Sequence, residues 1–169
     1  MKTKLFMTGL LFAAFICSCT TPKYLPKPTE IDVNQYGSYI TVLQKSGKYI
    51  EGELLAIDSN NLIILERSDS NYTKAPLIIP VNNVSHFTIK YAQPKHYGWS
   101  IPVYTLATIS HGFFLIFTAP VNLIVTISVT VGGENAFTYN DKKMTYEKLK
   151  MFARFPQGIP PNIEIADIK

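Results

Sequence analysis

Side chains that could perform catalysis or bind a metal ion are few and widely spaced in this chain. The three histidines, His86, His96 and His111, stand far apart and match no zinc-ligand spacing. Ser110 precedes His111, but a catalytic serine and histidine are brought together by the fold and not by adjacency in the sequence. The sequence contains no glycine-rich phosphate loop, nucleophile motif or paired carboxylates. These observations predict a non-enzymatic protein without a metal ion or cofactor.

Two isolated residues remain as functional candidates. His111 lies in a long uncharged stretch, and an ionisable side chain at membrane depth is a functional candidate. It could instead pack as a neutral ring against a carbonyl or a threonine hydroxyl. Arg154, in the proline-punctuated segment 153–161, could bind a carboxylate or a phosphate, or it could hold backbone carbonyls and fix the tail to the fold. An envelope enzyme with a site around His111 and Arg154 is therefore the alternative function.

The N-terminus has the layout of a bacterial export signal. Lys2 and Lys4 precede the uncharged apolar stretch Leu5–Ile16, which is too short to be a membrane-spanning helix. Both cysteines of the chain, Cys17 and Cys19, follow directly. The chain beyond Cys19 can therefore form neither a disulfide nor a cysteine metal site.

The residues Ile16-Cys17-Ser18-Cys19 resemble the lipobox of bacterial lipoproteins. The resemblance implies that residues 1–18 are a signal peptide and that Cys19 carries acyl chains such as palmitate on its sulfur and its new amino group. Several acyl chains on one residue hold a protein stably in a membrane. Thr20 stands where an aspartate would resemble an inner-membrane retention signal, so the resemblance implies the periplasmic face of the outer membrane. The alternatives are an ordinary secretory signal or an uncleaved anchor.

Composition narrows the possible classes of protein. The chain has 169 residues, of which 47% are hydrophobic and 17% charged, a balance that excludes a disordered chain and suits one folded domain. Its net charge is +4, and removing Lys2 and Lys4 with the signal leaves 14 basic and 12 acidic side chains, a net charge of +2. Such a weak charge gives no reason to expect a nucleic-acid partner.

A tether and a β-rich domain follow Cys19. Residues 19–31 contain several prolines and predict an extended, semi-rigid tether. In residues 32–93, runs of β-branched and aliphatic residues alternate with turn signals. The runs cover residues 39–43, 49–57, 62–66, 77–81 and 86–89. Five short antiparallel strands with tight turns predict a mainly β fold, a small curled barrel.

The β-rich domain is also similar to a known motif. The spacing of Gly47, Gly52 and Asp58, followed by an aliphatic run, is similar to the first motif of the Sm-like small barrels, and it fits other SH3-like barrels as well. RNA-binding Sm-like proteins carry an asparagine where this chain has Leu62, and residues 82–86 lack their Arg-Gly or Lys-Gly pair. A nucleic-acid-binding barrel is therefore a disfavoured third function, and we expect no nucleic-acid partner.

The segment 94–133 contains the longest uncharged interval of the chain. From His96 to Gly133 there is no Asp, Glu, Lys or Arg. Residues 101–118 are apolar enough for a membrane helix or a buried helix. Pro120 is expected to break this helix, because proline removes a backbone hydrogen bond. Residues 121–131 form a second apolar arm, and we predict an apolar helical hairpin.

Three arrangements of residues 101–131 remain open. The hairpin could dip into the leaflet that holds the lipid anchor, which the aromatic residues Tyr97, Trp99 and Tyr104 at its start favour. The segment could be a single bent span. It could also be a buried helix and a β-strand of the soluble core, which the β-branched second arm favours. The expected partners are membrane lipid, through Cys19 and in the first two arrangements through residues 101–131, and an unidentified envelope protein.

The last section, residues 134–169, predicts a C-terminal amphipathic helix. Thr145 is a suitable N-cap, apolar residues recur at helical spacing from Tyr146 to Ala153, and Pro156 ends the helix. The apolar stripe is expected to pack against the barrel or the hairpin, or to lie on a membrane surface. Overall we expect a non-enzymatic cell-envelope lipoprotein that serves as a structural or interaction module.

Overall fold

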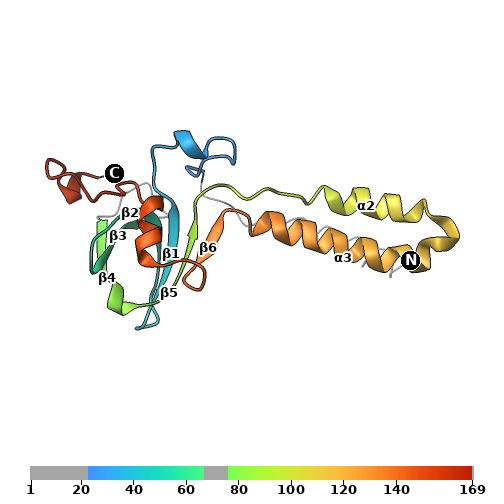
Figure 1. The fold of residues 1–169 in the computed structure, drawn as a ribbon, viewed down its shortest axis with the longest axis horizontal. Helices are drawn as coiled ribbons and strands as arrows, with labels where there is room; N and C mark the ends of the chain where they lie inside the picture. The colour runs from blue at the N-terminus through green and yellow to red at the C-terminus, as the bar shows by residue number, and fades with distance from the viewer. Residues whose placement is uncertain (1–22, 67–75, 169) are drawn as a thin grey trace, which may run out of the picture.

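The computed structural model describes residues 23–66 and 76–168, which form an open antiparallel β-sheet and a long helical hairpin (Figure 1). The strands are β1 (Tyr39–Gln44), β2 (Tyr49–Ile57), β3 (Asn61–Glu66), β4 (Pro76–Pro80), β5 (Val84–Lys90) and β6 (Thr138–Asn140). The helices are α2 (Ser100–Ile109), α3 (Leu115–Glu134) and α4 (Tyr146–Leu149). Short 3-10 turns lie at Ile31–Val33, Val81–Asn83, Gly112–Phe114, Lys150–Phe152 and Ile165–Asp167.

The mainly β prediction is confirmed, but in place of the predicted small curled barrel of five strands the structure has an open sheet of six. The sheet has six strands in the order β4-β3-β2-β1-β5-β6, and every neighbouring pair is antiparallel. A shift in the pairing of β2 with β3 between Leu54 and Ala56 bends the sheet. The sheet stays open because the outer edge of β5 is taken by β6, a three-residue strand from the C-terminal section.

The main core lies under the C-terminal helix, where aliphatic side chains of β1 to β5 pack together with Leu149 and Ala153. A second, smaller cluster joins Leu55, Ala56 and Ile63 to Ile168 of the C-terminal tail. Leu149 of α4 is fully buried, and the Tyr146 ring lies 5.3 Å from that of Phe87. Burying a leucine side chain contributes roughly 1.5–3 kcal/mol. The predicted C-terminal helix therefore exists, shortened to one α-helical turn and a 3-10 turn, and it packs against the sheet.

The start of the described chain is packed against the sheet instead of extended. Leu25 is 2% exposed. The backbone N–H of Gln93 donates to the Pro26 carbonyl over 2.9 Å, and its side-chain Nε2 donates to the Leu25 carbonyl over 2.8 Å. Residues 23–31 of the predicted tether are thus docked beside the segment that leads into the hairpin.

Helices α2 and α3 run antiparallel and project away from the sheet (Figure 1). The prediction that Pro120 breaks the hairpin is wrong. The chain turns at Ser110–Phe114, where Gly112 adopts a φ of 56°, a conformation that favours glycine. Pro120 lies inside α3, near its start, where it removes a single hydrogen bond to the carbonyl of Ile116 and the helix continues. Of the three arrangements left open for residues 101–131, the buried helix and β-strand is wrong, because residues 121–131 are helical and lie outside the core.

Candidate functional site

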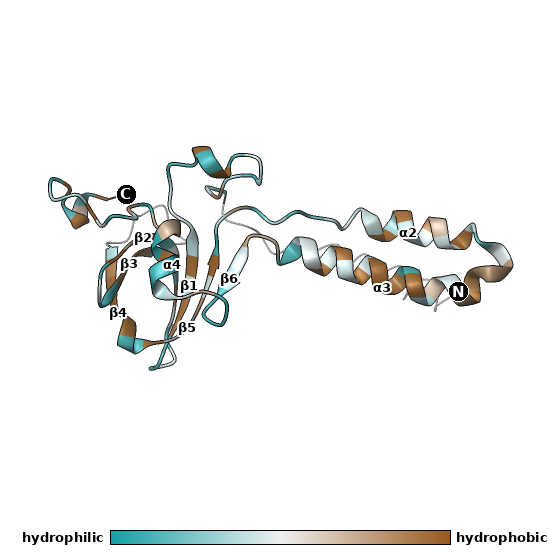
Figure 2. Cartoon of the chain, in the orientation of Figure 1, coloured by the Kyte–Doolittle hydropathy of each residue, from teal (hydrophilic) through white to brown (hydrophobic). Residues whose placement is uncertain are grey.

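The two hairpin helices expose apolar side chains over most of their outer surface. Phe113 is 84% exposed and Ile116 74% exposed, and none of the most apolar window of α3 is buried. Figure 2 shows hydrophobic residues along both helices. The large exposed apolar residues of α3 are Leu115, Ile116, Phe117, Val121, Leu123, Ile124, Val125, Ile127 and Val131. At 100° per residue these positions cover more than half of the circumference of α3, and the remaining face, with Asn122 and Thr126, is partly buried toward α2.

Most hydroxyl groups of the hairpin bond to its own backbone. Five of them each donate to a backbone carbonyl three or four residues earlier in the chain. These bonds join Thr105 to Ile101, Thr108 to Tyr104, Ser110 to Ala107, Thr118 to Phe114, and Thr126 to Asn122. The hydroxyls of Ser100 and Thr130 are buried without a hydrogen-bond partner. Because internal satisfaction of polar groups is what a water-free surrounding requires, the five bonded hydroxyls do not argue against an apolar environment.

One polar contact joins the two helices. The side-chain amide of Asn122 in α3 donates to the Thr108 hydroxyl in α2. Asn122 is an amide inside a long apolar helix, and an unpaired amide would be costly in an apolar surrounding. The bond therefore fixes the register of α2 against α3 and pairs this amide at the same time.

Aromatic packing holds the base of the hairpin together. Tyr91, on the way into the hairpin, stacks on Tyr139 at 5.5 Å and meets Phe137 edge to face at 5.4 Å. The backbone N–H of Tyr91 donates to the Phe137 carbonyl over 3.0 Å. Closer to the helices, the Tyr97 ring lies against Gly133, where a Cβ atom would clash with it. The two legs therefore leave the sheet side by side.

His111 lies at the tip of the hairpin, in the turn between α2 and α3, and is exposed. Its backbone N–H donates to the Thr108 carbonyl over 3.1 Å, and its carbonyl accepts from Phe114 N–H over 3.2 Å. The ring is therefore presented outwards by the turn and is not packed in the core.

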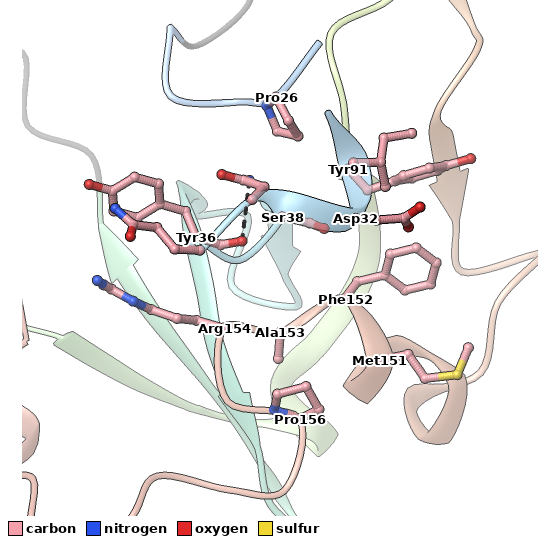
Figure 3. Close-up of a pocket in the computed structure, with 13 residues that line it drawn as sticks. Pro26, Asp32, Tyr36, Ser38, Tyr91, Met151, Phe152, Ala153, Arg154 and Pro156 are labelled. Carbon is pink, nitrogen blue, oxygen red and sulfur yellow. Dashed lines mark hydrogen bonds between the residues drawn. The ribbon is translucent and has the colours of Figure 1, made fainter. Parts of the chain in front are cut away.

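Arg154 lies beside the sheet, at the far end of the molecule from the hairpin tip (Figures 1 and 3). Its guanidinium is 3.7 Å from Glu53 Oε2 and stands 5.2 Å from the Tyr36 ring centre, a cation–π distance. Its backbone N–H donates to the Leu54 carbonyl over 2.9 Å. Arg154 thus fixes the C-terminal tail against β2, and it does not meet His111.

Glu53 is a buried carboxylate that the sequence reasoning missed. It is 7% exposed, and its Oε1 accepts the Gly37 N–H over 2.6 Å. Burial raises the pKa of Glu53 above its ordinary value, while the Gly37 N–H and the Arg154 charge oppose that rise. The sequence pattern of β2 did not indicate that Glu53 is buried, because its partners Gly37 and Arg154 lie 16 and about 100 residues away in the chain.

A cleft of about 420 Å³ lies next to Arg154 (Figure 3). Its lining includes Asp32, Tyr36, Tyr91, Phe152 and Arg154. Within residues 23–66 and 76–168, no group of three or more His, Cys, Asp or Glu side chains is placed to hold a metal ion. The cleft therefore offers mixed aromatic and charged walls without a recognisable catalytic set.

His86 of β5 has a partner, Asp141, that the sequence did not indicate. His86 Nδ1 lies 2.8 Å from Asp141 Oδ2, in an exposed pair. The hydrogen bond to His86 holds the pKa of Asp141 below its ordinary value. The pair joins β5 to the turn after β6, and both groups lie on the surface.

Cys19, the predicted lipidation site, lies outside the described residues.

Comparison with known protein-family models, with curated proteins and with solved structures finds no match to this chain.

Proposed function

We propose that this protein is a non-enzymatic cell-envelope lipoprotein whose α2–α3 hairpin inserts into the lipid bilayer. Cys19 supplies the acyl anchor, and the sheet stands at the membrane surface as a structural or interaction module. The observation that carries the proposal is the hairpin itself, uncharged from His96 to Gly133 and exposing large apolar side chains over more than half of the circumference of α3. The lipobox resemblance supports the periplasmic face of the outer membrane as its location.

Lipid explains the exposed hairpin better than a protein partner does. A partner protein or a second copy of this chain would cover one stripe of a helix, as helices do in coiled coils. Here the exposed apolar side chains cover more than half of the circumference of α3, and the Thr118 and Thr126 hydroxyls bond to their own backbone. A continuous apolar medium covers a surface of this width.

A non-enzymatic role is supported by the separation of the candidate residues. His111 lies at the hairpin tip, while Arg154 is engaged with Glu53 beside the sheet. An enzyme whose site joins these two residues would need them within contact distance of one substrate.

The proposal is tested by removing the acyl anchor. Residues 1–18 are replaced by a cleavable secretory signal and Cys19 is changed to serine. We expect this unlipidated protein to remain in the membrane fraction after a carbonate wash, because the hairpin holds it there.

A second pair of variants, made in the unlipidated protein, locates the attachment. Ile124→Lys places a charge in α3 and Ile78→Lys places one in β4, at positions 65% and 53% exposed respectively. A lysine at the centre of a membrane helix costs about 2.5–3.5 kcal/mol. We expect Ile124→Lys to shift the protein toward the soluble fraction and Ile78→Lys to leave it membrane-bound. A soluble unlipidated parent protein, or equal behaviour of the two variants, would rule out insertion of the hairpin.

We also propose that strands β1 to β5 keep an Sm-like or SH3-like arrangement, opened at one side. Support comes from the strand order, which places β1 between β2 and β5, from the bend in β2, and from the 3-10 turn Val81–Asn83 between β4 and β5. An experimental structure with a different neighbour for β1 would contradict this assignment.

A further inference from the structure

The length of the hairpin indicates how deep it reaches. Helix α3, Leu115–Glu134, has 20 residues. At 1.5 Å per residue it is about 30 Å long, which matches the hydrocarbon core of a bilayer, about 30 Å thick. The other leg is held in register with it, because Tyr97 packs against Gly133 and Thr108 bonds to Asn122.

The polar groups of the hairpin are arranged by depth. Asn122 lies about 10 Å along α3 from Leu115 and about 16 Å from Gly133, so the amide that is paired across the helices lies within the helix length, nearer the tip than the base. The aromatic residues Tyr97 and Trp99 lie at the base, where aromatic rings favour the membrane–water interface.

The tip is the other polar end of the hairpin. Ser110, His111 and Gly112 form its turn, and the His111 side chain is exposed there. An imidazole and the open backbone of a turn are costly within hydrocarbon, but they are readily solvated by water and headgroups. The phenylalanines that follow, Phe113 and Phe114, stand next to this polar turn and are exposed as well.

We propose that the hairpin crosses the entire hydrocarbon core and presents Ser110, His111 and Gly112 to the headgroup layer on the opposite side. This inference rests on the proposed membrane insertion and adds to it that the tip emerges beyond the far leaflet. The sheet and the tip therefore face different compartments, and His111 is the residue through which the chain contacts the distant lipid surface.

Single-cysteine labelling measures this arrangement in cells, because no cysteine follows Cys19. Three variants of the full chain place a thiol at the base (Lys95→Cys), at mid-depth (Ile124→Cys) and at the tip (His111→Cys). Ser110→Cys gives a second tip position in case the His111 variant is unstable. A membrane-impermeant maleimide is applied to intact cells, then after the outer membrane is opened, then after the inner membrane is broken without detergent, and finally in detergent. The unchanged chain measures labelling of Cys19 itself.

We expect the tip and the base to become labelled at different steps, and the mid-depth thiol to be labelled only in detergent. If the tip thiol, like the thiol of Ile124→Cys, is labelled only in detergent, the hairpin does not cross the hydrocarbon core. Insertion into the near leaflet would still stand. Tip, mid-depth and base labelling at the same step would place the hairpin in water and overturn both the crossing and the proposed function.

Discussion

Burial of Glu53 has an electrostatic cost that its partners only partly offset. The carboxylate accepts the Gly37 N–H and faces Arg154, yet burial dominates and raises its pKa. Gly37, Glu53 and Arg154 belong to three separate segments, so the pair joins the N-terminal segment, β2 and the C-terminal tail. Arg154 therefore pairs with a carboxylate of its own fold, Glu53.

The raised pKa of Glu53 predicts a pH-dependent stability. The folded state binds the Glu53 proton more tightly than the unfolded state, so the stability that Glu53 contributes is present below its ordinary pKa of 4.5 and is lost as the pH rises through the raised value. We expect Glu53→Gln to lack this dependence. Chemical unfolding of both proteins in detergent solution, at about pH 4 and about pH 7, measures the difference. If the parent protein instead became more stable relative to the Glu53→Gln variant between about pH 4 and about pH 7, the sign of this prediction would be wrong.

At the scale of elements, the hairpin depends on a close approach at its base. Gly133 is buried against the Tyr97 ring and the Lys95 carbonyl. Its neighbour Gly132 faces open space. Alanine substitutions at these two adjacent helical glycines therefore distinguish the effect of helix propensity from the effect of packing between the two legs of the hairpin.

We expect Gly133→Ala to destabilise the hairpin base, because the new Cβ would clash with the Tyr97 ring and with backbone that cannot move freely. Gly132→Ala is the matched control, and it should be neutral or stabilising by about 0.5–1 kcal/mol through helix propensity. Thermal unfolding in detergent measures stability, and the emission of Trp99, the only tryptophan of the chain, reports on the base. Identical effects of the two substitutions would argue against the packed base.

At the scale of the whole molecule, the sheet, the N-terminal segment and the hairpin meet at one place. Gln93 binds the carbonyls of Leu25 and Pro26 just before the chain enters the hairpin. The turn between β1 and β2 lies at the other end of the strands, since Tyr39 pairs with Lys90 and Gln44 pairs with Val84. The β1–β2 turn therefore lies at the end of these strands opposite the junction with the hairpin.

We expect Leu25→Ala to release the N-terminal segment from this junction. Truncating a buried leucine costs about 2–5 kcal/mol, and the freed segment should be cleaved faster by trypsin after Lys23. Val33→Ala, at a position 80% exposed, is the control and should leave the cleavage rate unchanged. Equal cleavage of the Leu25 variant and the parent protein would show that the segment is not held by this side chain.

The sequence by itself determined the features that depend on local composition. The uncharged interval from His96 to Gly133, the β-rich runs of β1 to β5 and the helical spacing around Leu149 each appear in consecutive residues. Hydropathy and periodicity report the surroundings that a segment prefers, so they predict elements and the apolar hairpin. They do not report which distant segments meet.

Only the tertiary structure decided which distant segments contact one another. It placed the turn of the hairpin at Gly112 instead of Pro120, added β6 to the edge of β5, and joined Glu53 to Arg154. It also decided that residues 101–131 lie outside the core, which their hydropathy could not, because a buried helix and a lipid-facing helix have the same composition. Each of these features depends on contacts between segments far apart in the chain, where a local pattern carries no information.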